Sequence, residues 1–123
     1  HSRDLFSKAT LDNILPHEDA FQLNINVNAE TITLIFKIKN GYYIYRDSVL
    51  LTLDDERLDF VYKETDWHIT NDQFLGTQEV AFKKIELEIN KSNIEGHDIF
   101  EISYQGCSEG IYCYPVVKKE IKI

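Results

Sequence analysis

The two cysteines of the chain, Cys107 and Cys113, are its only ones, and they lie six positions apart. The turn residues between them, with Gly110 able to supply a positive φ, allow an antiparallel β-hairpin that sets the cysteines opposite each other. Facing residues on neighbouring strands lie about 4.5 to 5.5 Å apart, which a disulfide can span. Such a pair can either staple a fold or open and close by thiol-disulfide exchange.

A staple at this spacing would add modest stability. Closing a loop of about seven residues removes only about 2.4 kcal/mol of conformational entropy from the unfolded chain. A chain of 123 residues with 43% apolar residues should not need it. The neighbouring Tyr104, Tyr112 and Tyr114 suit a pair that opens and closes. Spacing alone leaves both interpretations open.

The alternation of apolar and polar residues predicts the secondary-structure elements that must position this pair. This alternation has the period of a β-strand over much of the chain, with turn signals about every 8 to 12 residues. We therefore predict an all-β fold, an antiparallel β-sandwich of about eight or nine strands. The predicted strands span residues 20–28, 31–39, 42–46, 48–53, 58–62, 80–89, 99–104 and 117–123.

Two segments depart from the alternation. Residues 1–15 are predicted to be an N-terminal arm, with one or two helical turns that Pro16 would end, and residues 16–123 to be the folded domain. Residues 63–77 are predicted to form a long loop that carries Trp67, His68 and Phe74. Long loops without a pattern of their own are often functional.

Composition argues against several classes of function. With 21 acidic and 13 basic residues the net charge is −8, whereas nucleic acids and anionic membranes attract basic surfaces. A basic or neutral protein partner is compatible with this charge, and we expect a monomeric domain. No apolar run of about 18 residues and no signal peptide occurs, and the chain starts without Met. We interpret it as an excised part of a longer protein.

Two rival chemistries fit the residues less well. A metal site would need both cysteines and two of His17, His68 and His97, but the spacings match no common ligand pattern. The sequence contains no Gly-x-Ser-x-Gly, phosphate-loop or HExxH motif, so no motif indicates hydrolysis or nucleotide binding. We therefore expect no metal and no cofactor besides the cysteine pair.

Three motifs taken together resemble one known family. They are Tyr104-Gln-Gly-Cys-x5-Cys-Tyr-Pro115, Gly41-Tyr-Tyr-Ile-Tyr-Arg46 and Asp72-Gln-Phe-Leu-Gly76. In this order and spacing they resemble the N-terminal periplasmic domain of the thiol:disulfide interchange proteins DsbD, from about Ile14 onwards. The resemblance implies an immunoglobulin-like sandwich with the cysteine pair on a β-hairpin, and a protein-disulfide reductase activity. It also implies a location in the periplasm of a Gram-negative bacterium, as part of an inner-membrane protein.

The resemblance further implies partners and roles for the cysteines. Electrons would arrive from a thioredoxin-like C-terminal domain of the parent protein. They would leave to periplasmic thioredoxin-fold proteins, namely disulfide isomerases and a cytochrome c maturation thioredoxin. Cys113 would form the mixed disulfide with a partner, and Cys107 would resolve it.

The same resemblance assigns a cap loop over the sulfurs. Asp72, Gln73, Phe74 and Leu75 match its positions, with Phe74 as the lid. Asp72 would either raise a thiol pKa by its charge or accept a proton as a base. Gln73 replaces a residue that is often acidic, and Leu75 replaces an aromatic one, which leaves Phe74 as the main shield.

The pocket beneath this cap would be lined by Tyr43, Tyr45 and Tyr114. The alternative to the whole scheme is an immunoglobulin-like binding or adhesion module whose disulfide is purely structural.

Overall fold

The computed structural model describes residues 14–123. Most of the predicted N-terminal arm, including its predicted helical turns, lies outside these residues. The described chain starts with Ile14 and Leu15, which pack against the core, and continues into a single helical turn, α2 (His17–Ala20). No helix within residues 14–123 has the length and apolar character needed to cross a membrane.

The described residues form thirteen short strands in three sheets, and every pairing between them is antiparallel. The first sheet has the order β1-β2-β9-β6, with β1 (Phe21–Val27), β2 (Thr31–Ile38), β9 (Lys84–Asn90) and β6 (Val61–Lys63). The second sheet has the order β13-β10-β4-β5, with β13 (Val117–Lys122), β10 (Ile99–Tyr104), β4 (Leu50–Leu53) and β5 (Glu56–Arg57). The third sheet has the order β12-β11-β3-β8-β7, with β12 (Tyr112–Cys113), β11 (Gly106–Ser108), β3 (Tyr42–Tyr45), β8 (Gly76–Ala81) and β7 (His68–Asp72).

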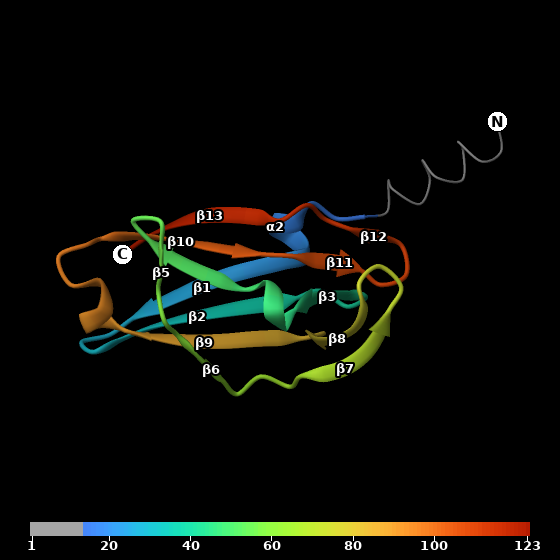
Figure 1. Ribbon diagram of the computed structural model, residues 1–123, viewed down its shortest axis with the longest axis horizontal. Helices are drawn as coiled ribbons and strands as arrows, with labels where there is room; N and C mark the ends of the chain where they lie inside the picture. Colours follow the sequence, from blue (N-terminus) through green and yellow to red (C-terminus); the bar gives the residue numbers. More distant parts are fainter. Residues whose placement is uncertain (1–13) are drawn as a thin grey trace.

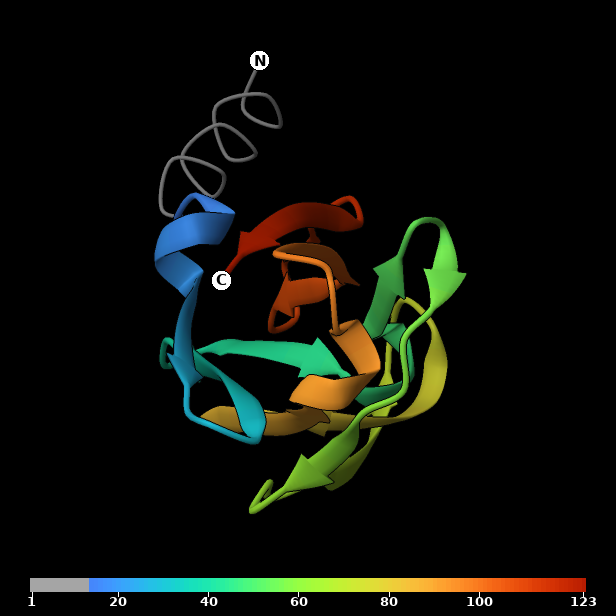
Figure 2. The ribbon, with the colours of Figure 1, turned by 90° about the vertical axis from the view of Figure 1, so that its left-hand side faces the viewer.

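The first and second sheets face each other and enclose the main core, which Figure 2 shows with β2 and β9 on one side and β10 and β13 on the other. The core consists of the inward residues of the alternating strands. These include Ile32, Leu34, Phe36, Leu51, Ile85, Leu87, Ile89, Phe100 and Ile102, each at most 1% exposed. The predicted antiparallel sandwich is confirmed, although its strands are shorter and more numerous than predicted.

Strand β1 is less buried than predicted. Phe21 is buried, but Ile25 and Val27 are 41% and 42% exposed although they lie opposite core residues of β2. The difference follows from the position of β1 at the edge of its sheet, where only β2 pairs with it.

The predicted long loop at residues 63–77 is wrong. Its second half is a β-hairpin made by β7 and the start of β8, paired from His68–Val80 to Asp72–Gly76. Strand β7 escaped detection because it is an edge strand with most of its residues exposed, so its sequence His-Ile-Thr-Asn-Asp lacks apolar alternation.

The third sheet forms one end of the molecule. The β11–β12 turn and the β7–β8 turn meet there, while the β1–β2 turn and the 3-10 turn Lys91–Ile94 lie at the opposite end (Figure 1). The chain returns to this end after Tyr104, where it passes from β10 of the second sheet to β11 of the third. The cysteines therefore lie at the end of the sandwich, outside its main core.

Candidate redox site

The two cysteines are joined by a disulfide across the hairpin of β11 and β12. They face each other in the strand register, with Cα atoms 4.0 Å apart. The connecting turn closes through a hydrogen bond of 3.1 Å from the Ile111 N–H to the Ser108 carbonyl, and Gly110 has a φ of 73°. A positive φ at this third turn position is characteristic of a type II turn and favours glycine. The facing pair predicted from spacing is thus present.

The strand that carries Cys107 lies very close to its neighbours. A Cβ atom on Gly106 would stand 2.4 Å from the Phe21 ring and 2.8 Å from the Tyr43 carbonyl oxygen. Only glycine allows β11 to approach β3 this closely, and the register then sets Cys107 opposite Tyr43. Cys107 is completely buried, whereas Cys113 is partly exposed.

A small cluster separate from the main core surrounds the sulfurs. It consists of buried Tyr43, Tyr45, Val80 and Cys107, with Phe82 and Cys113 packed against it. Val80 lies opposite Tyr45 in the β3–β8 register, and the Phe82 ring contacts that of Tyr43 at 5.7 Å. The sequence pattern marked Val80 and Phe82 only as strand residues, because alternation does not reveal which neighbours an inward residue meets.

Tyr45 contacts both sulfurs. Its hydroxyl oxygen lies 3.1 Å from Cys107 Sγ and 3.5 Å from Cys113 Sγ. Neither sulfur of a disulfide carries a proton, so the hydroxyl is the group that can donate. Burial, partly offset by a hydrogen bond with Tyr43 and reinforced by Asp72, raises the pKa of Tyr45 to about 12. Tyr45 therefore stays protonated at neutral pH.

Asp72 is a buried carboxylate, 6% exposed, at the end of β7. Its Oδ2 accepts a hydrogen bond from the Tyr43 hydroxyl, and its Oδ1 accepts the backbone N–H groups of Phe74 and Leu75, each at 2.7 Å. Burial alone would raise the pKa of Asp72, but these hydrogen bonds outweigh it and hold the pKa below its ordinary value. Burial and the bond to Asp72 in turn raise the pKa of Tyr43. The carboxylate thus links the β7–β8 turn to the tyrosines beside the sulfurs.

The turn formed by Gln73, Phe74 and Leu75 is exposed. Phe74 is 40% exposed and Leu75 52% exposed. Asp72 and Gln73 line a small pocket together with Glu109 and Gly110 of the cysteine hairpin, which places the two turns side by side (Figure 1).

Tyr114 lies apart from the other two predicted pocket residues. Its ring belongs to the main core, 5.4 Å from the ring of Phe21, and its hydroxyl donates to the Leu15 carbonyl. The structure therefore brings Tyr43 and Tyr45 to the sulfurs and places Tyr114 on the core side of the hairpin.

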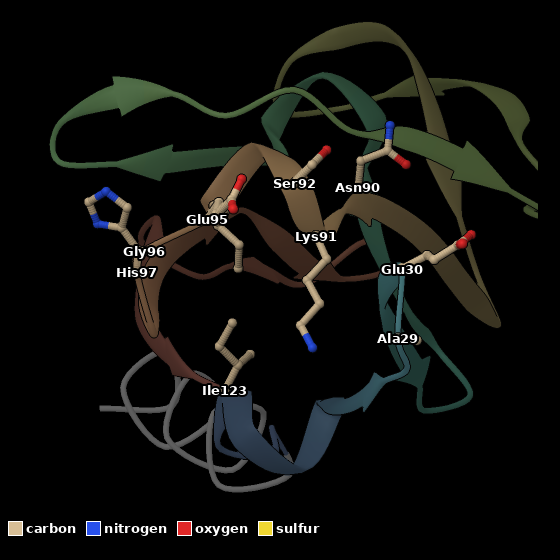
Figure 3. A pocket seen from close by; sticks show the side chains of 10 residues that line it. Ala29, Glu30, Asn90, Lys91, Ser92, Glu95, Gly96, His97 and Ile123 are labelled. Atoms are coloured by element: carbon tan, nitrogen blue, oxygen red, sulfur yellow. The ribbon is translucent and has the colours of Figure 1, made fainter.

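A separate pocket lies at the other end of the sandwich. Its lining includes Glu30, Lys91, Glu95, His97 and Ile123 (Figure 3). It contains neither cysteine. Within residues 14–123, no group of three or more His, Cys, Asp or Glu side chains is arranged to hold a metal ion.

The fold and the site define an immunoglobulin-like β-sandwich with a disulfide on a terminal hairpin, flanked by tyrosines and a buried carboxylate. Residues 12–123 match the sequence-family model described as thiol:disulfide interchange protein DsbD, N-terminal. The chain belongs to this family. It is 26% identical over 120 residues to the thiol:disulfide interchange protein DsbD of Escherichia coli strain K12, and equally to that of Shigella flexneri serotype 5b. The match covers 97% of this chain but 21% of each relative, so the chain spans about a fifth of their length.

Two solved structures from Neisseria meningitidis have the same fold. The reduced form of the DsbD N-terminal domain superposes with a TM-score of 0.75 and 26% identity, covering 91% of this chain and 90% of that one. A complex between the N-terminal domains of DsbD and PilB matches with a TM-score of 0.67 and 25% identity, covering 90% and 88% of the two chains.

Proposed function

We propose that this domain is a thiol-disulfide exchange module that reduces disulfides of other proteins through Cys107 and Cys113. The observation that carries the proposal is the bonded pair on a hairpin at one end of the sandwich, outside the main core. A bond at this position can open without disturbing the packing between the first and second sheets.

The exchange transfers two electrons. In the reduced domain the Cys113 thiolate attacks a disulfide of the partner, and one partner sulfur leaves as a thiolate and takes up a proton. Cys107 then attacks Cys113 Sγ, the mixed disulfide breaks, and the second partner sulfur leaves and is protonated. The domain ends as a disulfide and the partner as a dithiol.

Burial supports this division of roles between the cysteines. Cys113 is partly exposed, so a partner sulfur can approach it, whereas Cys107 is completely buried and can react only with Cys113. The Tyr45 hydroxyl is placed to donate to a thiolate on either sulfur, which favours the reactive charged form.

We propose the β7–β8 turn as the cap of the site, with Phe74 as the lid that a partner displaces. The Asp72 carboxylate connects the lid to the pocket, because it accepts hydrogen bonds both from the backbone of this turn and from the Tyr43 hydroxyl. Both carboxylate oxygens of Asp72 already accept hydrogen bonds, which favours an indirect influence on the sulfurs, through the tyrosines, over direct proton transfer.

The partners we propose are thioredoxin-fold proteins: a thioredoxin-like C-terminal domain of the parent protein as the electron donor, and periplasmic disulfide isomerases and a cytochrome c maturation thioredoxin as acceptors. Family membership and the similarity to a DsbD domain in complex with a PilB domain support this choice. The same membership supports a periplasmic location as part of an inner-membrane protein.

The test mixes the reduced domain with an oxidised thioredoxin-fold isomerase and follows the free thiols. We expect both proteins to exchange, Cys107→Ala to accumulate a mixed disulfide through Cys113, and Cys113→Ala to be inactive. Absence of exchange, or exchange that persists in Cys113→Ala, would refute the proposal.

The complete burial of Cys107 favours a second candidate, a binding module in which the disulfide is a staple. Measuring the reduction potential under native conditions separates the two. A structural disulfide typically lies below about −300 mV, whereas an exchange module should be reduced at less negative potentials.

A further inference from the structure

We infer that Gln105 is a positioning residue for the exchange reaction. Its side-chain amide ties the segment that follows Cys113 to the strand that carries Cys107, and so keeps the two sulfurs within reach while their bond is open. The inference rests on the proposed function. Gln105 lies between β10 and β11, at the point where the chain passes from the second sheet to the third.

Two hydrogen bonds make the tie. Gln105 Nε2 donates to the Tyr114 carbonyl at 3.1 Å, and the Tyr114 N–H donates to the Gly106 carbonyl at 3.0 Å. Beyond them, β12 has only two register pairs, Cys107–Cys113 and Ser108–Tyr112. It is the edge strand of its sheet, and Pro115, which has no N–H to donate, follows directly after Tyr114. The Tyr114 side chain is anchored in the main core, and the Gln105 amide adds a restraint on the Tyr114 backbone, directly next to Cys113, that persists when the disulfide is open.

The backbone of Gln105 is itself held in place by hydrogen bonds. The Gln105 N–H donates to Ser48 Oγ at 2.9 Å, and the Gln105 carbonyl accepts the Tyr45 N–H at 3.1 Å. Ser48 Oγ also lies 2.7 Å from the Tyr45 carbonyl oxygen. The same backbone therefore fixes Tyr45, whose hydroxyl touches both sulfurs, and the side chain that reaches the Cys113 segment.

The tie should matter most at the resolving step. In the mixed disulfide, Cys113 is bonded to the partner, and Cys107 must attack Cys113 Sγ while the partner sulfur leaves as a thiolate. The rate depends on how often the Cys113 sulfur is presented to Cys107, which is an effective concentration set by the restraints on the two strands. Removing a restraint lowers that concentration.

The tie and the disulfide must also reinforce each other. If the closed disulfide holds Tyr114 where Gln105 can form its hydrogen bond, then by linkage that hydrogen bond stabilises the closed disulfide by the same free energy. Loss of the amide should therefore destabilise the oxidised domain more than the reduced one, whereas a purely structural contact would affect both forms equally.

The experiment equilibrates the domain with reduced and oxidised glutathione and measures the constant for closing the Cys107–Cys113 bond. Gln105→Met keeps the length of the side chain and removes its donor, and Gln105→Ala removes it altogether. Gln22→Met is the matched control, because Gln22 is exposed on β1 in another sheet. We expect the constant to fall about fivefold in both Gln105 variants, as for one lost hydrogen bond. We expect a longer-lived mixed disulfide with glutathione and no change in Gln22→Met.

Melting temperatures of both redox forms complete the test. An unchanged glutathione constant in Gln105→Met, with equal losses of stability in the oxidised and reduced forms, would show an ordinary structural contact and overturn the inference. If Gln105→Ala fails to fold, Gln105→Met decides. A wild-type domain that exchanges with glutathione but with no thioredoxin-fold protein would contradict the proposed function and leave this result unaffected.

Discussion

The two faces of β3 bury tyrosines for different purposes. Tyr42 and Ile44 face the main core, whereas Tyr43 and Tyr45 face the cluster around the sulfurs. The Tyr42 hydroxyl accepts the Leu15 N–H, at 2.9 Å, and so fastens the start of the described chain. Tyr43 and Tyr45 direct their hydroxyls to a carboxylate and a disulfide.

The difference continues beyond β3. In the main core, the Tyr104 hydroxyl is buried and has no hydrogen-bond partner within residues 14–123, so this ring is held by packing against Phe36 at 4.7 Å. On the site face every tyrosine hydroxyl reaches a group that can take part in chemistry or hold the cap. Deletions on the core face should therefore change stability, and deletions on the site face should change reactivity.

The largest expected effect is on the core face. Phe36→Ala should lower the free energy of unfolding by about 3 to 5 kcal/mol, because it removes a fully buried ring and leaves a cavity. Chemical denaturation measures this loss. The glutathione equilibrium of the pair, measured where the variant is folded, should stay at the wild-type value, and a large shift would mean that the two faces are coupled.

Asp72→Asn should have the next largest effect. Replacing a carboxylate that accepts a hydroxyl and two N–H groups should cost about 1 to 3 kcal/mol at pH 7. The pKa of Asp72 is lowered by folding, so its contribution is present above the unfolded value of about 3.9 and is lost as the pH falls through the folded pKa.

Denaturation of wild type and Asp72→Asn between pH 7 and pH 3 tests this sign. The difference between the two proteins should shrink below about pH 4. Asp59→Asn, at an exposed position, is the control and should lose little at any pH. A difference that grows on acidification would contradict the lowered pKa.

Tyr45→Phe should change reactivity more than stability. Without the hydroxyl, a thiolate on Cys113 loses a donor, so its pKa should rise and its alkylation at pH 7 should slow about fivefold. The reduced domain is treated with iodoacetamide across a pH series. Tyr104→Phe deletes the same atom in the core and should leave the alkylation profile unchanged.

Phe74→Ala should have the smallest effect on stability, below about 0.5 kcal/mol, because the side chain is 40% exposed at a turn. If Phe74 covers the sulfurs, the reduced pair should react faster with small oxidants and alkylating reagents. Leu75→Ala, one position along and 52% exposed, is the matched control. Equal rates in all three proteins would show that Phe74 is not the lid.

The sequence by itself determined most of the long strands and the facing cysteines. Alternation located the inward residues of β2, β9 and β10, because apolar side chains in these strands avoid water on one face only. The six-residue spacing and Gly110 predicted the facing cysteines, since both are properties of a local hairpin. The three motifs were sufficient to predict the family.

Only the tertiary structure decided how the site is built. Tyr45 meets the sulfurs because β3 pairs with β11, which carries Cys107, whereas Tyr114, directly after Cys113, packs into the main core. The Asp72 carboxylate meets Tyr43 because β7, whose sequence has no apolar alternation, pairs with β8, which in turn pairs with β3. A periodic pattern records whether a residue is inside, and the partner it meets there depends on strands far apart in the chain.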